Sequence, residues 1–367
     1  MADSFAEAKI LYSLPWNSDV VSAVAFIGND KVAAANRRGD ILIWNLPASG
    51  DKGPDPSRRL VGHTGPVNRL LLSPDGKTLI SAGGDRTVKC WDAIKTDGEP
   101  GTIVLNDGYR FVGVTEKVAK LPDPPPPLTA KVVEQKPIRE FTEHKDWLWG
   151  LAISRDGKTL VTGDDSKLVI LSDALTGAEQ RRWKVKQWIR SLDISPDGKL
   201  VVTAEYFPQT SDKDVQAGLR GWDAQTGQMK FDVSKGLPGP VSMVRFSDDG
   251  KHLAFCVGPI DRDGLSGKVF LLDPATGEKV RELTPAHQRG ATDLTFHPDG
   301  KHLVTCGRDR AVKFWRLSDG GLVREIAPAD KKDQFPPFYH AISINPAGKL
   351  LAIADGLGQV VICTLVA

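Results

Sequence analysis

A histidine, a serine and an aspartate, the residue types of a hydrolase triad, lie close together in residues 62–92, which read GHTGPVNRLLLSPDGKTLISAGGDRTVKCWD. In such a triad His63 would act as the base, Ser81 as the nucleophile and Asp85 as the group that orients the imidazole. A serine nucleophile also needs an oxyanion hole and open access, and the chain has no G-x-S-x-G elbow. The residue types alone therefore do not establish a catalytic site.

The same residue types recur at the same spacing farther along the chain. The first set, with separations of 18, 4 and 6 residues, consists of His63, Ser81, Asp85 and Trp91. The second set, with identical separations, consists of His287, Thr305, Asp309 and Trp315. Two copies of one catalytic centre, one with threonine for serine, are a poor explanation. We interpret each set as a structural relay in which the aspartate holds the histidine, the histidine meets the hydroxyl, and the hydroxyl meets the indole N–H.

Two other stretches carry incomplete versions of this set. One keeps His144 and Thr162 but has Ser166 and Ser172 at the positions of the aspartate and the tryptophan. The other keeps only Thr203 and Trp222. Partial loss is tolerable in a scaffold and would abolish an active site, so these copies favour the structural interpretation.

The turn inside the opening stretch is part of a repeat that runs along the chain. Six copies are marked by the turn positions Asp75, Asp156, Asp197, Asp249, Asp299 and Ala347, and VSAVAFIGNDKVAAANRRGDILIWNL is a seventh. In each copy an alternating apolar run, a turn and further short runs predict a meander of antiparallel strands. Spacings of about 40 to 50 residues are typical of propeller blades with four strands each.

The tryptophan and aspartate in CWD and GWD, and the GH before the first strand, resemble the WD-repeat β-propeller family. Four copies keep the aromatic residue, at Trp44, Trp91, Trp222 and Trp315, and three replace it, with Ser172, Leu272 and Cys363. The resemblance covers nearly the whole chain and implies an all-β, seven-bladed propeller of four-stranded antiparallel blades, a single domain over residues 1–367. The strand in AKILYSLPW is expected to complete the last blade and so close the ring.

Residues from about 95 to 133 do not fit the repeat. They contain four consecutive prolines, which a sheet interior does not accept, and they lack both the turn and the tryptophan. We predict an insertion between the third and fourth strands of the second blade, on the face opposite the loops that precede the first strands. An eighth, degenerate blade is the alternative.

Composition argues against several classes of partner and cofactor. A net charge of +2 and a pI near 8.2 argue against nucleic-acid binding. No signal peptide or membrane-length apolar run is evident, so we expect a cytoplasmic monomer without membrane association. The cysteines occupy apolar runs without CxxC spacing, which predicts buried thiols, and no metal or cofactor is expected: Cys90, Cys256, Cys306 and Cys363.

The resemblance implies that peptides dock at the channel mouth, where each blade presents one variable residue. These positions are Ser22, Asn68, Trp149, Arg190, Ser242, Thr292 and His340. Aromatic residues and arginine are typical of binding hot spots. Arg86 and Arg310, each directly after a relay aspartate, are expected on the same rim and favour an acidic or carboxylate-bearing peptide.

Two functions remain in competition at this point. The first is a non-enzymatic scaffold that binds a partner peptide at the channel mouth. The second is a propeller enzyme, a lactonase-like hydrolase or a lyase, which needs several carboxylates or histidines converging on the channel. The aligned mouth positions offer only Arg190 and His340 as titratable groups, so the sequence favours the scaffold.

Overall fold

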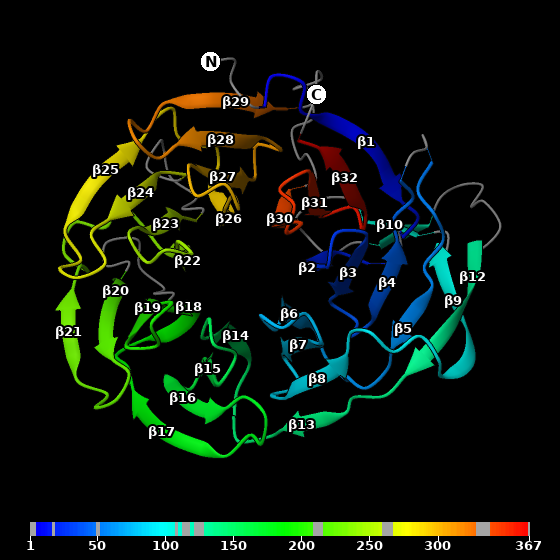
Figure 1. Cartoon of the computed structure of the whole chain (residues 1–367), viewed down its shortest axis with the longest axis horizontal. Coiled ribbons are helices and arrows are strands. Elements are labelled where there is room, and N and C mark those ends of the chain that lie inside the picture. Colours follow the sequence, from blue (N-terminus) through cyan, green and yellow to red (C-terminus); the bar gives the residue numbers. More distant parts are fainter. Residues whose placement is uncertain are drawn as a thin grey trace.

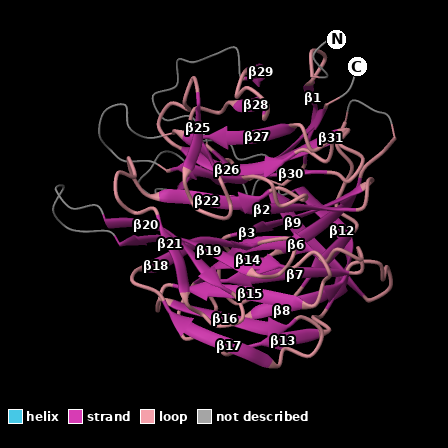
Figure 2. Cartoon of the chain, turned by 60° about the vertical axis from the view of Figure 1, so that its left-hand side comes forward, coloured by secondary structure: helices cyan, strands magenta, loops and turns pink. Residues whose placement is uncertain are grey.

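A computed structural model describes residues 5–16, 19–48, 52–106, 109–111, 118–120, 128–207, 216–258, 267–327 and 338–365. These residues form strands and turns, with no helix, and the strands are arranged as seven blades around a central axis (Figure 1). Figure 2 shows the same strands in an oblique view, again without a helix in the described chain. The described residues accordingly include no helix with the length and apolar character needed to cross a bilayer.

Each blade begins next to the axis and ends at the perimeter. Blade 1 contains β2 (Val21–Ile27), β3 (Lys31–Asn36), β4 (Ile41–Asn45) and β5 (Arg58–Leu60). Blade 2 contains β6 (Val67–Leu72), β7 (Thr78–Gly83), β8 (Val88–Asp92) and β13 (Arg139–Phe141). Blade 3 contains β14 (Leu148–Ile153), β15 (Thr159–Asp164), β16 (Leu168–Asp173) and β17 (Glu179–Lys184).

The remaining blades follow the same order. Blade 4 contains β18 (Trp188–Ile194), β19 (Leu200–Phe207), β20 (Gln216–Asp223) and β21 (Met229–Asp232). Blade 5 contains β22 (Val241–Phe246), β23 (Leu253–Val257), β24 (Val269–Leu272) and β25 (Lys279–Leu283). Blade 6 contains β26 (Ala291–Phe296), β27 (His302–Gly307), β28 (Val312–Arg316) and β29 (Leu322–Ile326). Blade 7 contains β30 (Tyr339–Ile344), β31 (Leu350–Asp355), β32 (Val360–Thr364) and the amino-terminal β1 (Lys9–Leu14).

The closure predicted from the amino-terminal strand is confirmed. β1 pairs antiparallel with β32, from Lys9 opposite Thr364 to Leu14 opposite Val360. The first and last described strands therefore share one sheet, and neither end of the ring is left as an open seam.

The repeated turn between the first two strands is built by its own side chains. In blade 2 the Asp75 carboxylate accepts hydrogen bonds from the Ser73 hydroxyl, at 2.5 Å, and from the Lys77 N–H, at 3.0 Å. Gly76 follows with a φ of 73°, a left-handed conformation that glycine adopts without steric cost. The same serine-to-aspartate bond occurs in blades 3, 4 and 5, so this short motif fixes where each hairpin turns.

The insertion interrupts blade 2 where predicted, but it pairs with a blade that the sequence did not indicate. It does lie between the third and fourth strands of blade 2, but its strands β9 (Glu99–Asn106) and β12 (Leu128–Gln135) extend blade 1 to six strands. β12 pairs parallel with β5 and antiparallel with β9 at the perimeter (Figure 1). Alternate residues are apolar and pack into the core beside Trp44, which explains this position: Ile103, Leu105, Ala130 and Val132.

The insertion therefore forms part of a neighbouring blade and does not make an eighth one. A short hairpin of β10 (Tyr109–Phe111) and β11 (Val118–Lys120) lies between its two strands in the sequence. The four consecutive prolines, residues 124–127, lie outside the described residues.

The apolar core lies between neighbouring blades. Trp91 of blade 2, for example, belongs to the same buried cluster as Ile43 and Leu60 of blade 1. The thiols predicted to be buried are buried and unpaired: Cys90, Cys256, Cys306 and Cys363. Burial raises the pKa of each thiol, which keeps all four in the neutral form.

Candidate functional site

The structure links the four side chains of the blade 2 set into one hydrogen-bonded chain. The Trp91 indole N–H donates to the Ser81 hydroxyl oxygen at 2.9 Å, and the Ser81 hydroxyl lies 2.6 Å from Nε2 of His63. Nδ1 of His63 lies 2.8 Å from the Asp85 carboxylate. Burial alone would raise the pKa of Asp85, but the hydrogen bond and charge of His63 outweigh it and hold this pKa at about 2. The carboxylate is thus an anionic acceptor, which fixes Nδ1 as the donor and Nε2 as the acceptor.

Blade 6 forms the same chain with threonine in place of serine. His287 lies 2.9 Å from Asp309 through Nδ1 and 2.7 Å from the Thr305 hydroxyl through Nε2. The Trp315 indole donates to the same hydroxyl at 2.9 Å. Ser81 and Thr305 are both 0% exposed, so neither hydroxyl reaches a substrate in this conformation.

Blade 1 shows what happens to the tryptophan indole N–H when the relay hydroxyl is missing. Ala34 stands ten residues before Trp44, where Ser81 precedes Trp91. The Trp44 indole nitrogen is buried and has no hydrogen-bond partner among the described residues. An unpaired buried donor costs about 1 to 3 kcal/mol, so the relay of blade 2 satisfies a group that blade 1 leaves unsatisfied.

Replacement of Ser81 by alanine is expected to lower the free energy of unfolding by about 1 to 3 kcal/mol, because Trp91 and His63 both lose their partner. Ser81→Thr restores the arrangement found in blade 6 and should recover most of this loss. Urea denaturation of the two variants measures the difference. Equal stability of wild type and Ser81→Ala would contradict a structural role for the relay.

Blade 3 completes its relay with a residue that the sequence interpretation missed. The carboxylate comes from Asp164, whose Oδ2 lies 2.9 Å from Nδ1 of His144, and the expected position, Ser166, only donates to Asp164. Asp164 is two residues beyond Thr162, so the pleat turns both side chains to one face. The corresponding residue in blade 2 is Gly83, where a Cβ would lie 3.3 Å from Nδ1 of His63. An aspartate at the position of this glycine is therefore the sequence signal that the relay carboxylate comes from the second strand of the blade.

Blade 4 replaces the histidine altogether. Thr203 accepts the Trp222 indole N–H at 2.8 Å and donates to Glu205 at 2.8 Å. Glu205 in turn pairs with the Arg220 guanidinium at 2.5 Å, and Nε of Arg220 donates to Asp232 at 2.9 Å. A buried ion pair therefore takes the place of the histidine and aspartate.

The residues predicted for the channel mouth lie together. One cavity of about 400 Å³, here called the mouth cavity, is lined by all seven of them: Ser22, Asn68, Trp149, Arg190, Ser242, Thr292 and His340. Its lining also includes side chains that the sequence did not single out, namely Arg37, Arg69, Tyr206 and Arg308. Arg86 and Arg310 do not line it; Arg310 acts on Asp355 of blade 7 instead. None of the described lining residues carries a carboxylate.

Three of the seven predicted residues connect neighbouring blades. The hydroxyl of Ser22 donates to the Val67 carbonyl at 2.5 Å, and the Asn68 amide donates to the Leu148 carbonyl at 2.8 Å. Thr292 does the same toward blade 7, with its hydroxyl 2.6 Å from the Tyr339 carbonyl. These polar groups are already engaged within the ring.

Trp149 and Arg190 form a preorganised pair on one side of the mouth cavity. The Arg190 guanidinium lies 4.9 Å from the centre of the Trp149 ring and 5.9 Å from that of Tyr206. The Trp149 indole donates to Asp165 at 3.0 Å, which fixes the plane of the ring. Burial raises the pKa of Asp165, and the Arg190 charge opposes this shift.

Comparison with known proteins agrees with this geometry. The family model described as WD domain, G-beta repeat matches residues 54–92, 135–171 and 277–316, which include the relays of blades 2, 3 and 6. The protein is a WD-repeat β-propeller. The match covers three of the blades, and the geometry above shows how the other four continue the ring.

Several curated proteins resemble this propeller. Striatin-4 of Mus musculus is 22% identical over 97% of this chain and 44% of its own length. The target of rapamycin complex subunit wat1 of Schizosaccharomyces pombe is 23% identical over 67% of this chain and 76% of its own length. Actin-interacting protein 1 of Drosophila melanogaster is 38% identical over 23% of this chain and 13% of its own length. The chain thus spans less than half the length of the first and third of these relatives.

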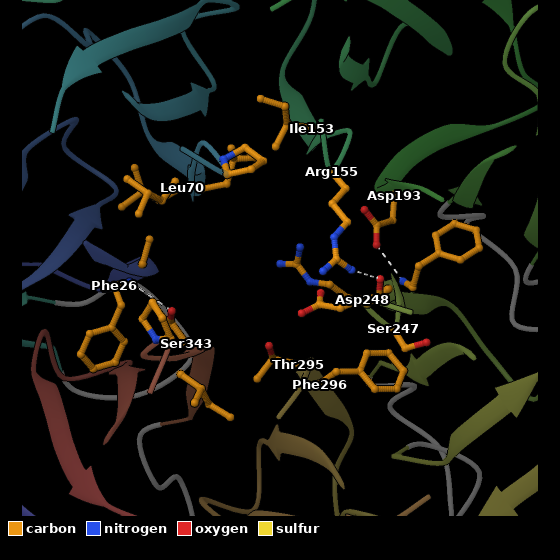
Figure 3. Close-up of a pocket in the computed structure, with 18 of the residues that line it drawn as sticks. Phe26, Leu70, Ile153, Arg155, Asp193, Ser247, Asp248, Thr295, Phe296 and Ser343 are labelled. Atoms are coloured by element: carbon orange, nitrogen blue, oxygen red, sulfur yellow. Dashed lines mark hydrogen bonds between the residues drawn. The ribbon is translucent and has the colours of Figure 1, made fainter. Parts of the chain in front are cut away.

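The opposite end of the propeller channel holds a second cavity, of about 560 Å³, lined by both apolar and polar side chains (Figure 3). Two of its charged side chains, Asp193 and Arg155, make hydrogen bonds across blade boundaries. Asp193 accepts the Phe246 N–H at 2.7 Å, and Arg155 donates to the Asp248 carbonyl across the opening. Burial raises the pKa of Asp193 to about 6, against the opposing charge of Arg245. These contacts join blades 3, 4 and 5. The lining of this cavity includes the carboxylates of Asp193 and Asp248, whereas the described lining of the mouth cavity has no carboxylate.

Proposed function

We propose that this propeller is a non-enzymatic interaction scaffold that binds a peptide segment of a partner protein in the mouth cavity, with an acidic side chain of the peptide at Arg190. The observation that carries the proposal is the composition of the described lining. It contains four arginines, an indole and a phenol ring, and no carboxylate. A cationic cavity of this kind attracts acidic groups and repels basic ones.

Arg190 is suited to bind a carboxylate. Its guanidinium is stacked against Trp149 and Tyr206 and donates no hydrogen bond to any described residue, so its donors remain available. A stacked guanidinium loses little rotational freedom on binding, and its planar edge matches the two oxygens of a carboxylate. Trp149 supplies apolar area next to the charge, the combination that dominates many hot spots.

The names of two relatives support an interaction role. One is an actin-interacting protein, and another is a subunit of the target of rapamycin complex. We carry over only the general property of binding other proteins. The four buried thiols fit a reducing compartment, so the cytoplasm remains our proposed location, with the free protein as a monomer.

Replacement of Arg190 by alanine is expected to reduce partner capture at least about tenfold, since loss of a hot-spot arginine commonly costs 2 kcal/mol or more. The measurement is quantitative mass spectrometry of proteins retained from a source-cell lysate by the immobilised wild type and variant at one salt concentration. Arg181→Ala removes an exposed arginine from the perimeter strand β17 and is the matched control. If Arg190→Ala keeps its melting temperature and captures the same proteins in the same amounts, the mouth cavity is not the binding site.

A further inference from the structure

A second cationic cluster lies on the side of the mouth cavity formed by blades 6, 7 and 1. Arg37 belongs to the turn between β3 and β4, Arg308 to the turn between β27 and β28, and His340 to the start of β30. All three side chains line the mouth cavity. Blade 7 stands between blades 6 and 1, so an arginine from each neighbour flanks the histidine (Figure 1).

The Phe338 ring links two side chains of this cluster, Arg308 and His340. The Arg308 guanidinium lies 4.7 Å from the centre of the Phe338 ring, and that ring lies 6.1 Å from the imidazole of His340. The Arg308 backbone N–H donates to the Gly290 carbonyl at 2.9 Å. Neither the Arg37 guanidinium nor the His340 imidazole makes a hydrogen bond to a described residue. Donors therefore face the cavity from two blades.

The imidazole is surrounded by positive charge. Burial lowers the pKa of His340, and Arg37 and Arg308 lower it further, to about 4. No described carboxylate acts on the imidazole. Asp19 interacts with Arg37, but it does not line the cavity. His340 is thus neutral at physiological pH, and an anion bound here would meet the field of both guanidinium groups.

We propose that Arg37, Arg308 and His340 form a subsite for a phosphorylated side chain of the partner peptide. The inference rests on the proposed function, and it assigns a different subsite from that of Arg190. A phosphorylated side chain carries about −1.5 to −2 charges at neutral pH and three acceptor oxygens, so it can bridge two guanidinium groups and a ring nitrogen. A carboxylate has one charge and two oxygens and is matched by the single guanidinium of Arg190.

Binding of a phosphoryl group has a defined effect on His340. A nearby anion favours the protonated imidazole, so the pKa of His340 rises from about 4 when the subsite is filled. Complex formation then takes up protons as the pH falls toward this new pKa. A carboxylate bound at Arg190, on the other side of the cavity, would leave the pKa of His340 nearly unchanged.

Isothermal titration calorimetry of the full chain at about pH 7 tests the subsite with three probes: N-acetyl-phosphoserine methylamide, N-acetyl-aspartate methylamide and inorganic phosphate. We expect the capped phosphoserine to bind at least about tenfold more tightly than the capped aspartate. Arg37→Ala and Arg308→Ala should each weaken the phosphoserine at least about tenfold, and the perimeter variant Arg181→Ala should not. NMR of histidine-labelled protein, with His340→Asn for assignment, should show the pKa of His340 rising when the phosphoserine is bound.

Three results would overturn the subsite: equal affinity for the phosphoserine and aspartate probes, unchanged phosphoserine affinity in Arg37→Ala and Arg308→Ala, or binding of inorganic phosphate without binding of the capped phosphoserine. The last result would indicate a free phosphate site.

Failure of the subsite is distinguishable from failure of the proposed function. If Arg190→Ala loses partner capture while phosphoserine does not bind, the scaffold proposal stands and this subsite is wrong. If phosphoserine binds as expected while neither Arg190→Ala nor Arg37→Ala affects capture, the cavity binds a phosphoryl group, but the proposal that partner proteins are captured there is wrong.

Discussion

Deletion of residues 1–14 is expected to abolish the stable monomeric propeller. The deletion removes β1, which pairs with β32 and completes blade 7. It also removes Phe5, Tyr12 and Leu14, whose exposed fractions are 2%, 8% and 1%. Burial of each such side chain contributes about 1.5 to 3 kcal/mol, and the sum approaches the 5 to 15 kcal/mol by which most domains are stable.

The loss extends beyond blade 7. The Phe5 ring stacks on Phe314 of blade 6 with 4.7 Å between ring centres, so the same segment ties two blades together. Without it, β32 presents an unpaired edge next to exposed apolar surface, a combination that promotes aggregation. Size-exclusion chromatography and thermal unfolding followed by circular dichroism measure the outcome. A truncated chain that stays monomeric with an unchanged melting temperature would show that β1 does not hold the ring closed.

Two point variants test the same strand without shortening the chain. Leu14→Asp places a carboxylate in the buried position and is expected to cost about 3 to 5 kcal/mol, through lost burial and an unpaired charge. Leu11→Asp alters the opposite, solvent-facing side of β1 and is expected to change stability by less than about 0.5 kcal/mol. The comparison separates the packing of β1 from its backbone pairing. Equal effects of the two variants would contradict the side-chain orientation described for β1.

Much of the fold was predictable because its determinants are local. In blades 2 to 5 the serine-x-aspartate-glycine turn fixes the first hairpin from within five residues, and the alternating apolar runs beside it predict which faces are buried. The position of the insertion was not predictable in this way. The parallel pairing of β12 with β5 joins residues about 75 positions apart, and the sequence of neither strand indicates which strand it pairs with. The apolar alternation at Ile103 and Leu105 indicates a strand, but not the blade to which it belongs.

The candidate site was predictable where equivalent positions in the first strands of different blades could be aligned in the sequence. Counting from the relay histidines located seven of the residues that line the mouth cavity. Arg69 was missed because the first strand of blade 2 has a bulge between Val67 and Arg69, so strict alternation fails there and Arg69 joins Asn68 at the cavity. Arg37 and Arg308 were missed because they lie in turns, where side-chain direction depends on the packing of neighbouring blades.

The buried ion pair of blade 4 carries the second large expected effect. Glu205 and Arg220 are 0% and 4% exposed, and their side chains meet at 2.5 Å. Removing one partner of a buried pair leaves an uncompensated charge and typically costs about 3 to 5 kcal/mol. Arg220→Met and Glu205→Met are therefore both expected to lower the free energy of unfolding, measured by urea denaturation at neutral pH.

The two single variants should differ in a definite order. Glu205 also accepts hydrogen bonds from the Thr203 hydroxyl and from the N–H groups of Lys186 and Gln187. Glu205→Met therefore leaves several donors without an acceptor and is expected to be the more damaging change. In Arg220→Met the carboxylate keeps those three donors. The double variant should lose less than the sum of the two singles, since it buries no unpaired charge.

The effect of Arg220→Met also has a predicted pH dependence. Burial raises the pKa of Glu205, and the Arg220 charge is the main influence that opposes this rise, so removal of Arg220 raises the pKa further. A carboxyl whose pKa is higher in the folded state than in the unfolded state stabilises the fold below the unfolded pKa, and this contribution is lost as the pH rises through the folded pKa. The Arg220→Met variant should thus be most destabilised near neutral pH, and its stability should approach that of the wild type as the pH falls toward the ordinary pKa of a glutamate.

Arg182→Met, which breaks the exposed pair with Glu179, is the matched control and should change stability by less than about 1 kcal/mol with no such pH dependence. A loss in Arg220→Met that is equal at all pH values, or no larger than in Arg182→Met, would show that the blade 4 pair does not behave as a buried ion pair.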